Sequence, residues 1–174
     1  MHAWWRLQSL RLLLVLNQFS MGLVGGHESS EIILAVNLVS LADLEIAYEE
    51  LEIVDYGPNG QAYGKMTGRF SGERLEGEVT LTNLAMLRAD GVNQPTMRGI
   101  LKTADGADIW VELDGLATLR ESDEARIFVA SVRFRTGEAR YGWLNELLAV
   151  VEGVLDTNSG SARGRLHECS ATIT

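Results

Sequence analysis

The chain has 174 residues, of which 46% are hydrophobic and 22% charged. This length and composition indicate one globular domain with a well-formed core and exclude a fibrous or disordered chain. Fifteen Lys and Arg against 24 Asp and Glu give a net charge of -9. That charge opposes binding to nucleic acids and to anionic lipid surfaces.

The chain has too few cysteines for a disulfide and no closely spaced histidines for a zinc site. Cys169 is the only cysteine, so an intramolecular disulfide is excluded and a reducing cytoplasm is the expected location. His2, His27 and His167 lie far apart in the chain, so no zinc-ligand spacing exists. The glycines near Lys65 also lack the spacing of a phosphate-binding loop. We expect no metal and no cofactor.

Residues 1–30 are expected to form an extension outside the fold, helical or poorly ordered, and residues 31–174 the domain. Arg6 and Arg11 precede the apolar run Leu12 to Leu16, which imitates a signal peptide. Five apolar residues are fewer than the roughly seven of an export signal and the roughly 20 of a membrane span. An export signal is therefore the less favoured interpretation, and Met21 is an alternative start.

The sequence of the first half of the domain predicts β-hairpins. Leu44, Ile46 and Tyr48 alternate with small or charged residues, which is typical of a strand with one half-buried face. The turn residues 57–60 then lead into a predicted strand over 62–70. A further turn at 71–73 leads into 75–82, where Val79 and Leu81 share one face.

The second half gives a sharper hairpin signal. Asp105-Gly106 between two β-rich runs predicts a two-residue type I′ turn. This register sets Leu101 opposite Trp110 and Gly99 opposite Glu112. A strand over 127–135 then directs four residues inward: Phe128, Ala130, Val132 and Phe134.

Short, hairpin-linked strands without long amphipathic helices favour an antiparallel sheet that closes into a barrel or a sandwich. The stretch 144–155 is ambiguous, because its leucines fit a helical stripe and part of it also fits a buried strand. Periodicity alone does not decide between the two.

Three stretches, 68–77, 105–111 and 134–145, resemble in order and spacing the uncharacterised bacterial and fungal family called domain of unknown function 3237. The phrase Thr-Gly-x-x-Arg-Tyr-x-Trp-Leu-Asn at 136–145 is the most specific of them. The resemblance covers roughly residues 38–155. At 82–87 the chain departs from the family's common Gly-Gly-x-Asp-Trp stretch.

The resemblance implies an all-β fold with minor α content: a single antiparallel β-barrel, loosely lipocalin-like. A short helical turn at Tyr141 to Asn145 would precede the last strands, which favours a strand for 147–155.

Trp110, Glu112 and Asp114 alternate along one predicted strand and so share one face. Inside a barrel, this face would bring an aromatic wall and a desolvated Glu112 to a ligand, with Glu112 as the candidate catalytic acid or base. On the outside, the same carboxylates would be ordinary solvated side chains, and this second interpretation is favoured.

Arg140, Tyr141, Trp143 and Asn145 form a second candidate ligand-binding group. They could line a barrel mouth and orient an apolar ligand. Alternatively they form a plug, in which the rings close the barrel end, Asn145 caps backbone and Arg140 pairs with an acid such as Glu138.

These features favour a protein that binds a small apolar molecule inside a barrel, as a carrier or as a cofactor-independent isomerase, cyclase or lyase. The alternative is a non-enzymatic interaction or self-assembly module, a homo-oligomer held by the N-terminal segment with Trp4 and Trp5 or by an exposed strand. The sequence does not decide whether the protein is an enzyme.

Overall fold

The computed structural model describes residues 36–171. Ten strands and one 3₁₀ helix follow each other along the chain: β1 (Val36–Tyr56), β2 (Asn59–Ser71), β3 (Gly77–Asn83), β4 (Met86–Leu87), β5 (Asn93–Gln94), β6 (Thr96–Lys102), β7 (Asp108–Leu119), β8 (Arg126–Arg135), η1 (Ala139–Glu146), β9 (Leu148–Asp156) and β10 (Ser161–Ala171). The extension predicted over residues 1–30 lies outside the described residues. Over 36–171, no helix has the length and apolar character needed to cross a membrane.

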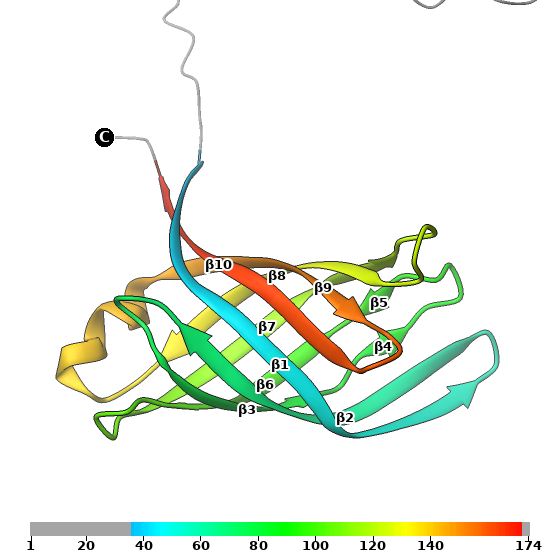
Figure 1. Cartoon of the computed structure of the whole chain (residues 1–174), viewed down its shortest axis with the longest axis horizontal. Helices are drawn as coiled ribbons and strands as arrows, with labels where there is room; N and C mark the ends of the chain where they lie inside the picture. The colour runs from blue at the N-terminus through cyan, green and yellow to red at the C-terminus, as the bar shows by residue number, and fades with distance from the viewer. Residues whose placement is uncertain (1–35, 172–174) are drawn as a thin grey trace, which may run out of the picture. The chain divides into compact units, whose positions relative to one another are not determined.

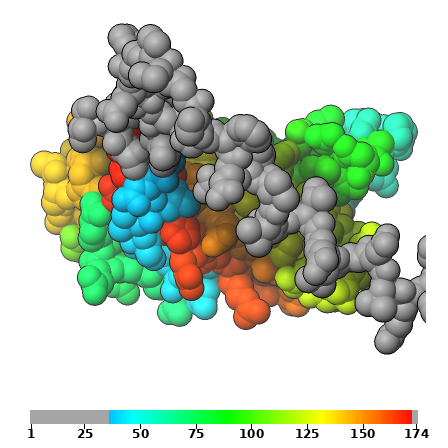
Figure 2. Space-filling view, turned by 90° about the horizontal axis from the view of Figure 1, so that it is seen from above, coloured from blue at the N-terminus to red at the C-terminus, as the bar shows by residue number. Residues whose placement is uncertain are grey.

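Eight strands form a closed antiparallel ring. In order around the ring they are β1, β2, β3, β6, β7, β8, β9 and β10, and β10 pairs with β1. Figure 1 shows these strands crossing one another around a common axis. In Figure 2, β10 in red lies between β1 in blue and β9 in orange. The predicted antiparallel β-barrel is confirmed.

The alternation of side chains along each strand builds the core. Phe128, Ala130, Val132 and Phe134 of β8 are buried, as predicted. Val79 and Leu81 of β3 are buried in the same way. Because successive side chains of a strand point to opposite faces, every second residue enters the barrel and its neighbours face outward.

Large side chains fill one half of the barrel. Phe70 and Phe134 pack edge to face, with ring centroids 6.3 Å apart, beside the fully buried Leu101 and Ile109. Leu144, the one buried residue of η1, adds to this packing. In Figure 1, η1 lies at one end of the barrel and the β1–β2 turn at the other. The η1 end is therefore packed solid.

The wall changes composition at the other end. There β3 ends at Asn83 and β6 begins at Thr96. The chain between them carries the short strands β4 and β5, which pair with β2, with each other and with β7. At this end, β4 and β5 therefore continue the barrel wall in place of β3 and β6, and the inward side chains of β3 and β6 are absent there.

The predicted register of the β6–β7 hairpin is wrong by one residue. Leu101 lies opposite Ile109 and Gly99 opposite Val111, whereas the prediction gave Trp110 and Glu112. The loop is longer than a two-residue turn, because the amide of Thr103 donates to the carbonyl of Ala107 at 3.0 Å. A one-residue slip exchanges the two faces of a strand, so Ile109 and Val111 are inside and Trp110 is outside.

The ambiguous stretch is divided between two elements. Residues Ala139–Glu146 form η1, and Leu148–Asp156 form β9, with Ala149 and Val151 buried. The resemblance predicted this sequence of a helical turn and a strand correctly, where the periodicity left both open. The leucines split because only Leu144 reaches the core from η1.

Close approach between β3 and β6 gives a test of the barrel. A Cβ atom on Gly99 would lie 1.8 Å from the backbone oxygen of Thr80, so the strands must separate to admit it. We expect Gly99→Ala to lower the free energy of unfolding by about 3 kcal/mol, measured by urea denaturation. The control is Gly137→Ala, whose Cβ would meet nothing within 4 Å. Equal stability of the two variants would contradict this packing.

Candidate functional site

The half of the barrel opposite η1 is hollow. Its cavity has a volume of about 400 Å³, which lies within the range of roughly 300–1,000 Å³ typical of small-molecule sites. The floor is made by residues of the filled half, including Leu44, Met66 and Leu113. The rim is formed by residues of the β4–β5 segment and of the turn after β9.

Most of the cavity wall is apolar. The apolar lining residues come from β1, β2, the β4–β5 segment and β6 to β10: Leu44, Ile46, Leu51, Ile53, Ala62, Met66, Ala85, Leu87, Pro95, Met97, Leu113, Ala117, Phe128, Ala130, Leu155 and Ala162. Five of them are alanines, and these small side chains leave the space that the phenylalanines fill at the other end. The lining is therefore suited to an apolar molecule.

Two polar side chains meet in this wall. Asn83 Nδ2 donates a hydrogen bond to the Tyr48 hydroxyl oxygen at 2.6 Å. Tyr48 reaches the cavity because it continues the inward alternation of Leu44 and Ile46, and a bulge follows it between Tyr48 and Glu50 in the pairing of β1 with β2. The extra residue changes which side chains face inward, so Tyr48 and then Leu51 both line the cavity.

The Tyr48 ring packs against a glycine of β2. A Cβ on Gly64, the β2 residue opposite both Leu51 and Asn83, would lie 2.5 Å from a ring carbon of Tyr48. The absence of a side chain at Gly64 leaves room for the Tyr48 ring beside β2. The backbone amide of Tyr48 donates to the carbonyl of Gly160 at 3.0 Å, which fixes this segment of β1.

Asn83 is buried with hydrogen-bonding capacity left over. Its residue is 2% exposed, and its Oδ1 has no hydrogen-bond partner. Exchanging the amide oxygen and nitrogen would leave the NH₂ group unpaired instead. An unsatisfied buried polar group costs about 1–3 kcal/mol, so either orientation leaves this side chain a source of instability in the free protein.

Burial raises the pKa of Tyr48 above its ordinary value of 10.0, an effect larger than the opposite one of the Asn83 hydrogen bond. The Tyr48 phenol is therefore neutral at physiological pH and keeps its O–H as a donor.

The remaining polar residues of the lining are Arg88, Asn93, Arg126 and Thr157. Arg126 donates to the carbonyl of Gly91 at 2.9 Å, and Arg88 pairs with Asp90. No Asp or Glu is among the described residues that line the cavity. Charge at the cavity is thus restricted to two arginines that already hold the 88–91 loop.

Trp110, Glu112 and Asp114 share one face, as predicted, and that face is the outside of the barrel. The Trp110 indole donates to Glu112 at 3.0 Å, and Arg133 and Arg135 lie 3.6 and 3.5 Å from the same carboxylate. These neighbours leave the Glu112 side chain 12% exposed. The condition for its predicted role in proton transfer, a place inside the barrel, is not met.

Asp114 belongs to the same outer network. Arg98 binds both of its oxygens, at 3.0 and 2.9 Å, and Arg133 lies 3.7 Å away. The group therefore joins β6, β7 and β8 by charge across their outer faces, and none of its residues lines the cavity.

The group at η1 closes the filled end, as the plug alternative describes. Tyr141 and Trp143 pack against the core cluster, and Arg74 lies 4.2 Å from the Trp143 ring centroid. Asn145 exchanges two hydrogen bonds with the backbone of Thr136, at 2.8 and 3.0 Å. None of these residues lines the cavity.

Arg140 finds a different acid from the one suggested by the sequence. It pairs with Asp105 at 3.2 Å rather than with Glu138, and the Tyr141 hydroxyl also donates to Asp105. The Thr103 hydroxyl bond and the Arg140 charge hold the pKa of Asp105 below its usual range. These contacts tie η1 to the β6–β7 turn.

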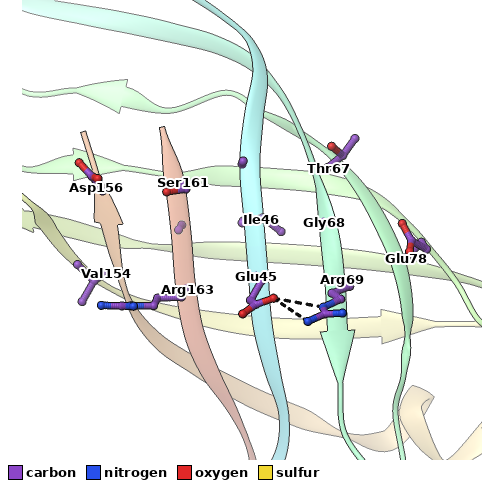
Figure 3. A pocket seen from close by; sticks show the side chains of 12 residues that line it. Glu45, Ile46, Thr67, Gly68, Arg69, Glu78, Val154, Asp156, Ser161 and Arg163 are labelled. Atoms are coloured by element: carbon purple, nitrogen blue, oxygen red, sulfur yellow. Dashed lines mark hydrogen bonds and ion pairs between the residues drawn. The ribbon is translucent and has the colours of Figure 1, made fainter. Parts of the chain in front are cut away.

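A trough of about 590 Å³ lies on the outer face of the barrel (Figure 3). One row of residues crosses it from β9 to β3: Val154, Arg163, Glu45, Arg69 and Glu78. Glu45 and Arg69 form an ion pair at 3.0 Å. The trough is larger than the cavity, but it is an open surface with alternating charges, and we place the candidate site in the cavity.

Potential metal ligands are dispersed. Within residues 36–171, no three His, Cys, Asp or Glu side chains come together in a way that could hold a metal ion.

The family model described as "Protein of unknown function (DUF3237)" matches residues 37–166. The chain belongs to the DUF3237 family. No curated protein sequence matches it significantly.

Solved structures share the fold of this DUF3237 protein. A β-barrel-like protein from Acinetobacter baumannii superposes with a TM-score of 0.69 at 17% identity, covering 78% of this chain and 97% of its own. A protein of unknown function from Clostridium acetobutylicum gives 0.68 at 17% identity, covering 78% and 100%. An enzyme from Penicillium herquei gives 0.61 at 22% identity, covering 78% and 95%.

The cavity residues had weak signals in the sequence. Tyr48 continues the inward alternation of Leu44 and Ile46, and the apolar positions then change from even to odd at Leu51 and Ile53, which marks the bulge. Asn83 continues the alternation of Val79 and Leu81 as its only polar member. A polar residue at the third inward position of a strand is the signal that could have indicated it.

The environment of Tyr48 predicts a distinct titration. We expect Tyr48 to ionise in a late step, above pH 10.0, when phenolate absorbance is followed with pH. The folded state favours neutral Tyr48, so its contribution to stability is complete below pH 10.0 and is lost as the pH rises through the folded pKa. Tyr48→Phe should remove the late step.

The matched control is Tyr63→Phe, since Tyr63 is 55% exposed and its loss should leave the late step in place. A late step that persists in Tyr48→Phe would show that another residue is responsible.

Proposed function

We propose that this DUF3237 protein binds a small, largely apolar molecule in the hollow half of its barrel. The observation that carries the proposal is a cavity of about 400 Å³ with sixteen apolar lining residues and a polar pair, Tyr48 and Asn83, in its wall. Apolar walls with a few placed polar groups are the usual features of a ligand site.

The proposal requires that a ligand binds; catalysis on the bound ligand is a further claim that goes beyond binding. A cofactor-independent isomerase, cyclase or lyase needs an acid or base beside its substrate. The cavity supplies the neutral phenol of Tyr48 and two arginines, and no carboxylate of the described chain. The structural relative from Penicillium herquei is called an enzyme, which supports including turnover in a search for ligands.

The ligand is proposed to bind as in lipocalins, where it enters a closed antiparallel barrel through one open end and is held inside. A cytoplasmic location, proposed from the single Cys169, fits a ligand of intracellular origin.

Filling the cavity should weaken binding. The probe is N-phenyl-1-naphthylamine, a neutral dye whose fluorescence rises when it leaves water. Ala117 is 6% exposed and lines the cavity, so Ala117→Phe places a ring where the dye would lie. We expect the dye to bind the wild-type protein and its affinity to fall by about tenfold or more in this variant, equivalent to ~1.4 kcal/mol.

The matched control is Leu116→Phe, because Leu116 is the neighbouring residue on β7, is 51% exposed and does not line the cavity. Glu112→Gln is a second control from the outer face. Both should retain the dye affinity within about twofold. Absence of dye binding to the wild-type protein, or equal loss in all variants, would contradict the proposal.

A second candidate function, self-assembly, is favoured by the end of the β1–β2 hairpin. Pairing of β1 with β10 ends at Ala47 opposite Ser161, so residues 50–56 are paired only with β2 in the described chain. Val54 is 64%, Tyr56 47% and Tyr63 55% exposed. An open strand edge with apolar neighbours is a site for pairing with a second copy of the chain.

Under this second function, the protein sediments as a dimer, and Val54→Lys weakens the dimer by about tenfold because a charge is brought to the apolar edge. Sedimentation velocity over a concentration series measures this. Leu119→Lys, at a residue that is 51% exposed at the end of β7, is the control. A wild-type protein that remains monomeric throughout would exclude this function for the hairpin.

A further inference from the structure

An arginine lies at the open end of the cavity. β8 begins at Arg126, and its inward positions at this end are Arg126, Phe128 and Ala130, which all line the cavity. Arg126 lies opposite Leu155 of β9, another lining residue. Its guanidinium reaches the rim, where Nη1 donates to the carbonyl of Gly91 in the β4–β5 segment at 2.9 Å. A positive charge is therefore built into the mouth of a mostly apolar cavity.

The Arg126 guanidinium keeps most of its donors and all of its charge. A guanidinium carries five N–H donors, and the Gly91 carbonyl that accepts from Arg126 is neutral. The ion pairs among the described residues join other cations to carboxylates, and none of them includes Arg126. Because Arg126 is half-buried, water solvates its charge less completely than on the open surface. The guanidinium therefore favours an anionic partner.

The second arginine of the lining differs from Arg126. Arg88 pairs with Asp90 inside the 88–91 loop, so its charge is already balanced. Asp90 does not itself line the cavity. The net positive charge at the mouth is therefore that of Arg126.

Acidic residues are kept away from this wall. Asp and Glu make up 24 of the 174 residues and the net charge is -9, yet no Asp or Glu of the described chain lines the cavity. The field of the whole protein favours a cation over an anion. The local charge at the mouth has the opposite preference, so the two effects predict different ligands.

We infer that the molecule bound in this cavity is an amphipathic organic anion, with an apolar body inside the barrel and a carboxylate beside Arg126. This inference rests on the proposed function and names the chemical class of its ligand. A carboxylate accepts two hydrogen bonds from one guanidinium, and such charge-assisted bonds are stronger than neutral ones. A neutral head group can accept from Arg126 but leaves its charge unbalanced.

The wall also sets how this anion is oriented. Phe128 and Ala130 follow Arg126 toward the floor, which contains Leu44 and Leu113, and none of these side chains can pair with a charge. A charge buried there would lose its water without compensation, so the anionic group stays at the mouth. A strand rises about 3.3 Å per residue, so the wall from Ala130 to Arg126 spans about 13 Å. The apolar body of the ligand is of about this length.

The test compares three ligands that share a ten-carbon chain and differ in the charge of the head group: decanoate, 1-decanol and decyltrimethylammonium. Each displaces N-phenyl-1-naphthylamine from the wild-type protein in a fluorescence titration. We expect decanoate to bind about fivefold more tightly than 1-decanol and about tenfold more tightly than the cation, because it alone balances the charge of Arg126. The net charge of the protein acting alone would reverse the order of the two ions.

Arg126→Gln removes the charge and keeps a polar side chain at the mouth. Its affinity for decanoate should fall about fivefold, whereas its affinity for 1-decanol should change by less than about twofold. Arg126→Lys keeps the charge and should retain most of the preference for decanoate. The matched control is Arg163→Gln, which removes the same charge from an exposed arginine of the outer trough and should leave the preference unchanged.

Salt dependence is a second measurement, and it needs no variant. Raising NaCl from about 0.02 to 0.2 M should weaken the binding of decanoate to the wild-type protein about threefold, because salt screens the ion pair at the mouth. The binding of 1-decanol should change much less. The wild-type comparison and its salt dependence stay decisive if Arg126→Gln impairs folding.

The outcomes separate this inference from the proposed function. If the wild-type protein binds the dye but takes up decanoate no more tightly than 1-decanol, the inference is overturned while the proposed function stands. An equal loss of decanoate affinity in Arg126→Gln and Arg163→Gln would also overturn it, because the preference would then reflect total charge. If neither the dye nor any ten-carbon ligand binds, the proposed function itself fails.

Discussion

Backbone pairing of β1 on both of its edges holds the molecule closed. Its first part pairs with β10 and its second part with β2, and the two pairings overlap over residues 43–47. This overlap joins the end of the described chain to its beginning, so that eight strands form a ring without open edges along most of its circumference. The inward faces of the ring then have one shared interior, and the rest of the structure follows from how that interior is divided.

The division follows side-chain size. At the η1 end, Phe70 and Phe134 meet the aliphatic residues of the facing strands and leave no space. At the opposite end, five of the sixteen apolar residues that line the cavity are alanines, and β4 and β5 replace β3 and β6 in the wall. Dense packing stabilises one half, and this allows the other half to keep a cavity. Scaffold and candidate site thus lie in the same barrel, in different halves.

Polar residues in the two halves serve different purposes. At the filled end and on the outer face, the charged groups find partners: Arg140 with Asp105, Arg98 with Asp114, and Arg133 and Arg135 with Glu112. In the cavity wall, Tyr48 and Asn83 satisfy each other only in part. Unsatisfied buried groups are rare in native proteins, and Asn83 Oδ1 is the buried side-chain atom of the described barrel that has no hydrogen-bond partner.

The sequence by itself determined the β class, the inward residues of β3 and β8 and, through its resemblance to DUF3237 proteins, the barrel and the helical turn before β9. These follow from alternation and from local motifs, which are properties of neighbouring residues. Only the tertiary structure decided the register of β7, because a single extra loop residue exchanges its faces and carries Glu112 outside. It alone also brought Tyr48 and Asn83 together, since their contact joins residues of β1 and β3 that are 35 positions apart in the sequence.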